Sequence, residues 1–269
     1  MTDSQDDTVL IERGERVAVV TLNRPEARNA LSSGLLRRLR VVMAECETDP
    51  DIELVILTGA DPAFSAGLDL KELGSTGGNL GTSRETGEGR NAPNDTPTTP
   101  WNPMTKLVIG AVNGVAVTGG FELALQCDFL VASERARFGD THTRVGILPG
   151  WGLSVLLPQF VGIRRAVEMS LTGNFLDAAE ALQFGLVNHV VPHGELLPTA
   201  RRLAADIVGN NAPAVRELLA SYKAIATMTV ADGLRHEARV GREWSRRTYE
   251  PGAVEARRQK IMERGRTQV

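Results

Sequence analysis

Apolar residues along the chain follow two spacings, one typical of strands and one typical of helices. From Leu31 to Cys46 they recur every three or four positions, which predicts a helix, and Ser32 is placed to cap its first turn. Short apolar runs rich in β-branched residues predict strands on either side of this helix. Strands that alternate with helices favour crossover connections, stacked β-β-α units and an α/β fold. The predicted strands are Val9–Arg13, Val17–Leu22, Glu53–Thr58, Leu107–Val112 and Asp128–Ala132.

After Trp151 the pattern becomes mostly helical. Turn signals divide this part into successive helices, which a strand-like run at Leu186–Val191 interrupts. We therefore expect an α/β core over residues 1–195 and a helical region over residues 196–269. The predicted helices are Gly152–Phe160, Ile163–Leu171, Asp177–Phe184, Glu195–Val208, Ala212–Ala226, Val230–Tyr249 and Ala253–Arg266.

The segment Gly74–Pro103 differs from the rest of the chain. It is rich in Gly, Thr, Asn and Pro and has almost no apolar residues, so it cannot build a packed core. Long insertions of this kind are either active-site lids or surface loops without a role, and both interpretations stay open.

Composition narrows the classes of protein that the chain can represent. A length of 269 residues is enough to bury a sizeable core, and a net charge of −3 without a basic stripe predicts no nucleic-acid partner. No apolar run reaches the length of about eighteen residues that spans a bilayer, so we expect no membrane partner. The first seven residues are acidic where a signal peptide would be basic, and the expected location is cytoplasmic.

The first candidate functional segment is a strand that runs into a glycine turn and a helix start. After Leu107–Val112 the chain reaches Gly119 and Gly120 and restarts with helical spacing. The N–H groups of a helix start are unpaired, and glycine lets a ligand approach them, so Gly119 N–H is a candidate donor to an oxyanion. Glu122 follows in an otherwise apolar helix, either held for chemistry or serving as an N-terminal cap carboxylate.

The same succession of strand, glycine turn and helix start occurs earlier in the chain. Glu53–Thr58 is followed by a turn that ends at Gly67, and helical spacing begins after Leu68. An oxyanion hole needs two N–H donors that are fixed before charge develops, and Leu68 N–H is the candidate second donor. An ordinary strand-to-helix connection capped by Asp69 is the alternative interpretation.

Five motifs follow one another along the chain, at Asn23–Leu31, Ala63–Leu70, Ala111–Ala124, Phe138–His142 and Gly146–Gly150. With these motifs the chain resembles the crotonase superfamily, the enoyl-CoA hydratase/isomerase group. The resemblance implies a crotonase-like spiral of repeated β-β-α units with a C-terminal helical trimerisation region, and assembly as a homotrimer or a dimer of trimers. It covers nearly the whole chain.

The resemblance also implies an acyl-CoA thioester substrate, with coenzyme A as part of the substrate and no separate cofactor. An enoyl-CoA hydratase would bind the thioester carbonyl between Leu68 N–H and Gly119 N–H and stabilise the enolate there. Glu122 matches the first of two glutamates that such hydratases use as general acid and base. The position of the second glutamate is held by His142.

His142 leaves the reaction open between several possibilities. A neutral imidazole can accept and donate a proton, so His142 can replace the glutamate in role, although a packed or capping histidine is the alternative. Asp140, two residues earlier, either orients His142 or stays solvated. One carboxylate also suffices for a 1,3-proton shift, so an enoyl-CoA isomerase is an alternative function, and a non-catalytic acyl-CoA binding protein is another.

Further residues match positions that contact substrate or coenzyme A in the resembled family. Trp151 either caps the acyl pocket or packs in the core, and Lys260 either meets a phosphate or is solvated. The full set is Ala27, Arg28, Ala30, Ala66, Asp69, Leu70, Gly120, Pro149, Trp151 and Lys260.

The two cysteines, Cys46 and Cys127, fall on helix faces with apolar neighbours, which predicts buried thiols. No pair of Cys or His residues has the spacing of metal ligands, so we predict no metal site.

Overall fold

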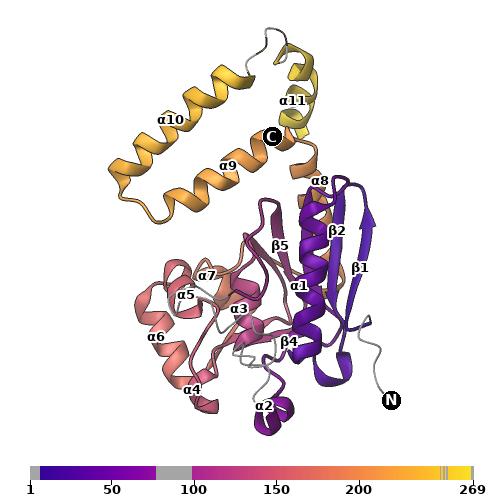
Figure 1. Ribbon diagram of the computed structural model, residues 1–269, viewed down its shortest axis with the longest axis vertical. Coiled ribbons are helices and arrows are strands. Elements are labelled where there is room, and N and C mark those ends of the chain that lie inside the picture. Colours follow the sequence, from indigo (N-terminus) through magenta and orange to yellow (C-terminus); the bar gives the residue numbers. More distant parts are fainter. Residues whose placement is uncertain (1–6, 77–98, 249, 251, 253, 268–269) are drawn as a thin grey trace. The chain divides into compact units, whose positions relative to one another are not determined.

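The computed structural model describes residues 7–76, 99–248, 250, 252 and 254–267. Most of the segment at residues 74–103 lies outside the described residues. The choice between an active-site lid and a surface loop falls on this segment. The chain divides into two compact units, Met1–Ala212 and Pro213–Val269 (Figure 1).

A six-stranded sheet in the order β1-β2-β3-β5-β7-β10 forms the first unit's main layer. β1 is antiparallel to β2, and every later pair is parallel. The first five of these strands confirm the predicted ones. The strand predicted over Leu186–Val191 is shorter, because Leu186 and Val187 pack in the core before it begins. The bounds are β1 Val9–Gly14, β2 Val17–Leu22, β3 Leu54–Gly59, β5 Leu107–Val112, β7 Phe129–Ser133 and β10 His189–Val191.

A second sheet, in the order β4-β6-β8-β9, is made of strands only three residues long. Each of its first three strands follows a strand of the large sheet and leads into a short helix. The resulting units are β3-β4-α2, β5-β6-α3 and β7-β8-α4, which confirms the expected repetition of β-β-α units. The bounds are β4 Ala63–Ser65, α2 Leu70–Thr76, β6 Val115–Val117, α3 Gly119–Leu125, β8 Arg137–Gly139, α4 His142–Val145 and β9 Phe175–Asp177.

Both faces of the large sheet are covered, which explains why its strands are continuous apolar runs. Along β3, Val55 and Leu57 point into the larger core, whereas Leu54 and Ile56 point into a second core on the opposite face. Helix α1, Ser33–Thr48, contacts β1 and β2 and contributes its apolar stripe to the larger core (Figure 1). The predicted cap is confirmed, because the Ser32 hydroxyl accepts a hydrogen bond from Leu35 N at 3.2 Å.

Helix α8, Leu196–Val208, covers the second face of the large sheet. It contacts β3, β5 and β7, and its buried Ala200 and Ala204 belong to the second core. Helix α8 packs within the first unit, whose boundary lies after Ala212. The remaining first-unit helices are η1 Pro25–Ala27, α5 Leu153–Val161, α6 Ile163–Thr172, α7 Ala178–Gln183 and η3 His193–Glu195.

The second unit consists of helices in the part of the chain that is described. They are α9 Ala212–Ile225, which begins at the boundary between the units, α10 Val230–Thr248 and α11 Glu255–Thr267. Across the described residues of both units, no helix combines the length and the apolar character needed to cross a bilayer.

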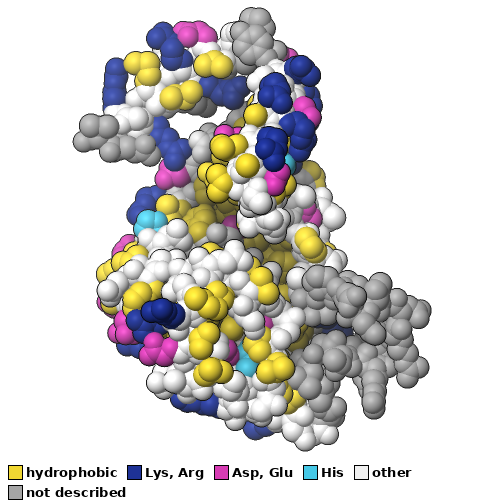
Figure 2. Space-filling view, turned by 90° about the vertical axis from the view of Figure 1, so that its left-hand side faces the viewer, with side chains coloured by type: hydrophobic (Ala, Val, Ile, Leu, Met, Phe, Trp, Pro, Cys, Tyr) yellow, Lys and Arg dark blue, Asp and Glu magenta, His cyan; other side chains and the backbone are white. Residues whose placement is uncertain are grey.

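Exposed apolar side chains gather on the first unit over α4, α5 and α6. Figure 2 looks at this side of the unit and shows hydrophobic side chains distributed across it. Patches of this kind on a globular protein are typical of surfaces that a partner covers. The exposed residues are Val145, Leu148, Val155, Phe160, Ile163, Val167 and Leu171.

Candidate active site

The turn after β4 presents the backbone of Leu68. Leu68 forms an isolated parallel bridge with Leu31, in which Leu31 N donates to Gly67 O at 2.7 Å and Asp69 N donates to Leu31 O at 3.1 Å. In such a bridge the N–H of the middle residue, Leu68, points away from the partner strand. Among the described residues this N–H has no hydrogen-bond partner.

The turn after β6 presents the first N–H groups of α3. Thr118 precedes the helix with a φ of 53°, an unusual conformation for a β-branched residue. Its N–H donates to Gly139 O at 2.9 Å, and its hydroxyl lies 2.5 Å from the Thr141 hydroxyl. These contacts fix the direction in which α3 begins. Gly119 N–H is also without a hydrogen-bond partner in the described part of the chain.

The two turns lie against each other. A Cβ atom built on Gly119 would be 3.6 Å from Leu68 Cδ2 and 3.4 Å from Trp151 Cζ3. Gly67, with a φ of +87°, packs so closely that a Cβ there would be 2.6 Å from Val117 O. The structure therefore brings together Leu68 and Gly119, the two residues predicted as oxyanion donors.

Glu122 lies in the first turn of α3 and is only 3% exposed. Its Oε1 accepts hydrogen bonds from Trp151 N at 2.7 Å and from Leu153 N at 3.4 Å. The carboxylate thus caps the beginning of α5, whereas the cap alternative had placed it on its own helix, α3. The other carboxylate oxygen, Oε2, faces an imidazole ring.

That imidazole belongs to His142, the first residue of α4. It is 2% exposed, and its Nε2 lies 3.5 Å from Glu122 Oε2. Its Nδ1 lies 2.6 Å from Oδ1 of Asp140, which is itself 1% exposed. Three buried ionisable side chains are therefore in successive contact, Asp140 with His142 and His142 with Glu122. The alternative of a solvated Asp140 is wrong.

The pKa values of His142 and Asp140 are shifted in opposite directions. Burial alone would lower the pKa of His142, but the hydrogen bonds and negative charges of Asp140 and Glu122 outweigh it and raise the pKa to about 9. Burial would raise the pKa of Asp140, but hydrogen bonds from His142 and Ser170 lower it. The imidazole is therefore positively charged at neutral pH.

This charge predicts a pH dependence of stability. The pKa of His142 rises from an ordinary 6.5 in the unfolded chain to about 9 in the folded protein, so its stabilisation is fully present below pH 6.5 and is lost as pH rises towards 9. We expect the free energy of unfolding to fall by about 3 kcal/mol over this range. Urea unfolding at pH 6.5 and at pH 9 measures this difference in the free energy of unfolding. His142→Gln is the control, and an equal fall in that variant would exclude His142 as the cause.

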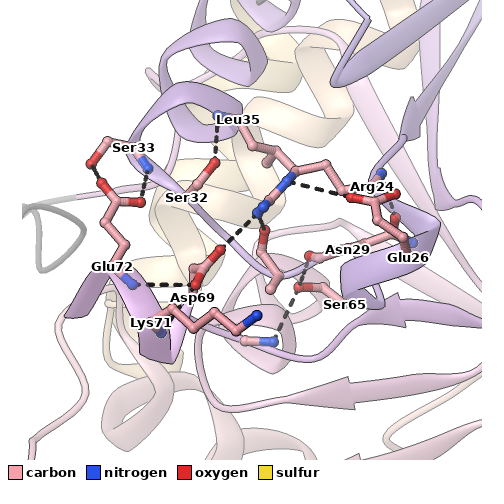
Figure 3. Close-up of polar contacts among 12 residues, drawn as sticks. Arg24, Glu26, Asn29, Ser32, Ser33, Leu35, Ser65, Asp69, Lys71 and Glu72 are labelled. Atoms are coloured by element: carbon pink, nitrogen blue, oxygen red, sulfur yellow. Dashed lines mark hydrogen bonds and ion pairs between the residues drawn. The ribbon is translucent and has the colours of Figure 1, made fainter. Parts of the chain in front are cut away.

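A polar network joins the Leu68 turn to the loop before α1 (Figure 3). Asp69 Oδ2 lies 3.0 Å from Arg24 Nη1, and the same nitrogen donates to Ala30 O at 2.6 Å. Asp69 Oδ1 accepts hydrogen bonds at 3.1 and 3.3 Å from the first N–H groups of α2. Burial would raise the pKa of Asp69, but the hydrogen bonds that it accepts and the charge of Arg24 together outweigh burial and lower it. The Asp69 side chain therefore holds the loop and the turn together.

The other residues expected to contact coenzyme A differ in how accessible they are. Arg28 is exposed, and Leu70 is 60% exposed, while Ala27, Ala30, Ala66 and Pro149 are half-buried. Gly120 is buried against β4, since a Cβ on it would be 2.4 Å from Ser65 O. Trp151 is buried in the larger core beside Gly119, as the packing interpretation expected, and its contact with an acyl chain stays a prediction. Lys260 lies on α11, and its side chain is outside the described residues.

The two cysteines are buried free thiols, as predicted, but Cys127 lies just after α3 and not on a helix face. Burial raises the pKa of Cys46 to about 11 and also raises that of Cys127, so neither is a thiolate at neutral pH. Among the residues that the structure describes, no group of three His, Cys, Asp or Glu side chains is arranged to hold a metal ion.

Sequence reasoning missed two features of this site. The one-turn helix α4, which carries His142, is too short to show a helical spacing. Arg24 was not selected either, although a cation two residues before an acidic Glu26 and next to Pro25 was visible in the first motif. Its partner Asp69 lies 45 positions away, a distance over which a single sequence gives no signal.

Comparisons with known proteins find similar sequences and similar structures. Residues 12–252 match the family model described as Enoyl-CoA hydratase/isomerase. The probable enoyl-CoA hydratase echA8 of Mycobacterium bovis is 39% identical over 247 residues, which cover 87% of this chain and 88% of that protein. The short-chain-enoyl-CoA hydratase of Clostridium acetobutylicum is 40% identical over 213 residues, or 78% of each chain. The crystal structure of an enoyl-CoA hydratase from Mycobacterium tuberculosis H37Rv has a TM-score of 0.74 at 54% identity, covering 88% of this chain and 98% of that one.

Proposed function

Because the chain belongs to the enoyl-CoA hydratase/isomerase family, we propose that it adds water to a 2-enoyl-CoA thioester. The thioester carbonyl oxygen accepts hydrogen bonds from Leu68 N–H and Gly119 N–H. Glu122 acts as general acid and base, and His142 takes the place of the second glutamate.

The oxyanion donors supply the larger part of the catalysis in this proposal. When water adds to the β-carbon, the electrons of the double bond move towards the thioester, and negative charge builds on the carbonyl oxygen. Backbone N–H groups that already lack partners do not have to break other hydrogen bonds to meet this charge. Removing one such donor typically lowers turnover by about a hundred- to a thousandfold.

The observation that carries the proposal is the contact of 3.5 Å between Glu122 Oε2 and His142 Nε2, beside the two turns. Hydration moves two protons, one away from water and one to the α-carbon, and so two proton-transfer groups in contact suit it. A 1,3-proton shift needs only one such group. An acyl-CoA binding protein needs neither, and it would gain nothing from a buried carboxylate beside the thioester.

The direct test is the loss of the conjugated enoyl-thioester absorbance when the protein is mixed with short- and long-chain 2-enoyl-CoA. We expect rapid loss with the wild-type protein. Formation of that absorbance from a 3-enoyl-CoA, without hydration, would instead identify an isomerase. Saturable binding of the CoA esters without turnover would identify a binding protein.

Replacing His142 with alanine should lower hydration turnover by roughly a hundred- to ten-thousandfold, since one proton-transfer group is lost. The same absorbance assay measures it. His193→Ala is the matched control, because His193 also bonds through both ring nitrogens, at 3.1 Å to Ser133 and 3.0 Å to Asp61, but does not contact Glu122. Equal turnover in His142→Ala and wild type would leave His142 with a packing role.

We also propose that the chain assembles as a homotrimer or a dimer of trimers, with residues 196–269 contributing to oligomer contacts and to coenzyme A binding. The exposed apolar residues over α4, α5 and α6 support a covered surface. Arg28 and Lys260 are the proposed phosphate contacts, and Ala27, Ala30, Ala66, Asp69 and Leu70 line the proposed coenzyme A channel. Gly120, Pro149 and Trp151 complete the proposed substrate contacts.

A further inference from the structure

We propose that Asp140 is a positioning residue that holds His142 as an imidazolium, so that His142 gives the proton to the α-carbon while Glu122 takes the proton from water. This inference rests on the proposed hydration and assigns the direction of each proton transfer within it.

The geometry fixes the orientation of the imidazole ring. Asp140 Oδ1 accepts hydrogen bonds from His142 Nδ1 at 2.6 Å and from the His142 backbone N at 3.1 Å. A carboxylate only accepts hydrogen bonds, so the proton of this contact lies on Nδ1. The other ring nitrogen, Nε2, is then directed at Glu122, which is anchored from the opposite side by Trp151 N at 2.7 Å.

The charged groups around the ring all have the same sign. Asp140 approaches from the turn after β8, and Glu122 approaches from α3. Helix α6 also packs on α4, and its contribution is the Ser170 hydroxyl, which hydrogen-bonds to Asp140. No cation among the described residues contributes to the electrostatics of His142, and its pKa of about 9 agrees with a charged ring between two carboxylates.

In the proposed cycle every proton that one group gives up is taken by another, and Asp140, His142 and Glu122 end in the state in which they began. Water oxygen bonds to the β-carbon, its proton passes to a Glu122 carboxylate oxygen, and the π electrons move to leave an enolate between Leu68 N–H and Gly119 N–H. The enolate then returns its electron pair to the α-carbon, which takes the proton from His142 Nε2. The site now holds a neutral imidazole and a protonated Glu122, and transfer across their 3.5 Å contact restores the starting state.

Asp140 stays ionised throughout this cycle. Its role is to keep one proton on Nδ1 and to stabilise the positive ring before the reaction, so it touches neither water nor substrate. A site with two glutamates must hold one of them protonated to donate, whereas this site uses a cation that is protonated at neutral pH.

The test is the pH dependence of kcat/KM for hydration in wild type and Asp140→Asn. Wild-type activity should fall on the alkaline side near pH 9, where His142 loses its proton. In Asp140→Asn this alkaline limb should move down by about 1–3 pH units, because one neighbouring negative charge is gone. Activity at pH 8 should fall by about ten- to a hundredfold, the size of loss typical when the partner that orients a metal-bound imidazole is removed. In Asp140→Glu, which keeps the negative charge, the alkaline limb should lie between that of Asp140→Asn and that of wild type.

Asp61→Asn is the matched control, since Asp61 Oδ2 also bonds a histidine nitrogen, His193 Nε2, at 3.0 Å outside this site. Its alkaline limb should match that of wild type. If Asp140→Asn lowers kcat/KM equally at every pH and the limb does not move, Asp140 has only a structural role and the inference is overturned.

A second measurement separates this inference from the proposed function. NMR titration of the imidazole protons needs no turnover, and the chain has only 4 histidines to assign. We expect His142 in the wild-type protein to titrate near pH 9. A protein that hydrates no enoyl-CoA but shows this titration would contradict the proposed function alone. A titration of His142 at or below its ordinary range would overturn the inference, whatever the activity.

Discussion

Replacing Glu122 with glutamine should lower hydration turnover by about a thousand- to ten-thousandfold while the affinity for a CoA ester stays close to that of wild type. Glutamine has nearly the same shape, and its amide oxygen can still accept the hydrogen bonds from Trp151 N and Leu153 N. The beginning of α5 therefore keeps its cap. The amide cannot take a proton from water, so the first step of the reaction loses its base.

Two measurements check this expectation. The enoyl-thioester absorbance assay gives turnover, and calorimetric binding of a saturated acyl-CoA gives the affinity. Glu47→Gln is the matched control, because Glu47 also accepts hydrogen bonds from two backbone N–H groups, Thr105 N at 3.1 Å and Lys106 N at 3.3 Å, away from the site. An active Glu122→Gln protein, with turnover within tenfold of wild type, would contradict the assignment of Glu122 as the base.

A change of Gly67 to alanine should lower turnover by about a hundred- to a thousandfold without adding any group to the substrate pocket. The new Cβ would lie 2.6 Å from Val117 O and 3.2 Å from Thr118 Cβ, and the φ of +87° is unfavourable for alanine. Backbone must move to accept it. Because Gly67 precedes Leu68 and Thr118 precedes Gly119, that movement separates the two oxyanion donors.

Stability has to be distinguished from catalysis in this experiment. Gly162→Ala carries the same kind of backbone strain, with a φ of +77°, but a Cβ there has no atom within 4 Å. We expect both variants to lose about 1 kcal/mol or more of stability from strain and only Gly67→Ala to lose turnover. Urea unfolding and the hydration assay, performed on folded protein, compare the two. Equal turnover in both variants would show that the spacing of the two turns is not critical.

The larger sheet could be predicted from the sequence because each of its strands is buried on both faces. Val55 and Leu57 fill one core and Leu54 and Ile56 fill the other, so the strand is one uninterrupted apolar run. The second sheet could not be predicted in this way. A strand such as β4, Ala63–Ser65, is too short for any alternation to appear, and only its pairing with β6 makes it a strand.

The candidate site likewise has a part that could be predicted from the sequence and a part that could not. Leu68, Gly119 and Glu122 belong to local patterns of strand, glycine turn and helix start, and the sequence therefore indicated them. The arrangement of His142 depends on which buried polar groups meet it, namely Glu122 of the preceding β-β-α unit at 3.5 Å and Asp140 of its own unit at 2.6 Å. Periodicity reports which face of an element is buried, but it does not report which buried polar groups meet.

The three β-β-α units each place one part of the proposed chemistry at the beginning of their helix. The first supplies Leu68 N–H ahead of α2, the second supplies Gly119 N–H and Glu122 on α3, and the third supplies His142 at the first position of α4. The backbone donors and the proton donor are thus encoded in different repeats. Mutation in the third repeat can exchange a carboxylate for an imidazole while the anion-binding turns of the first two keep their geometry. A scaffold divided in this way can evolve new proton chemistry one repeat at a time, without rebuilding the two turns proposed to hold the thioester.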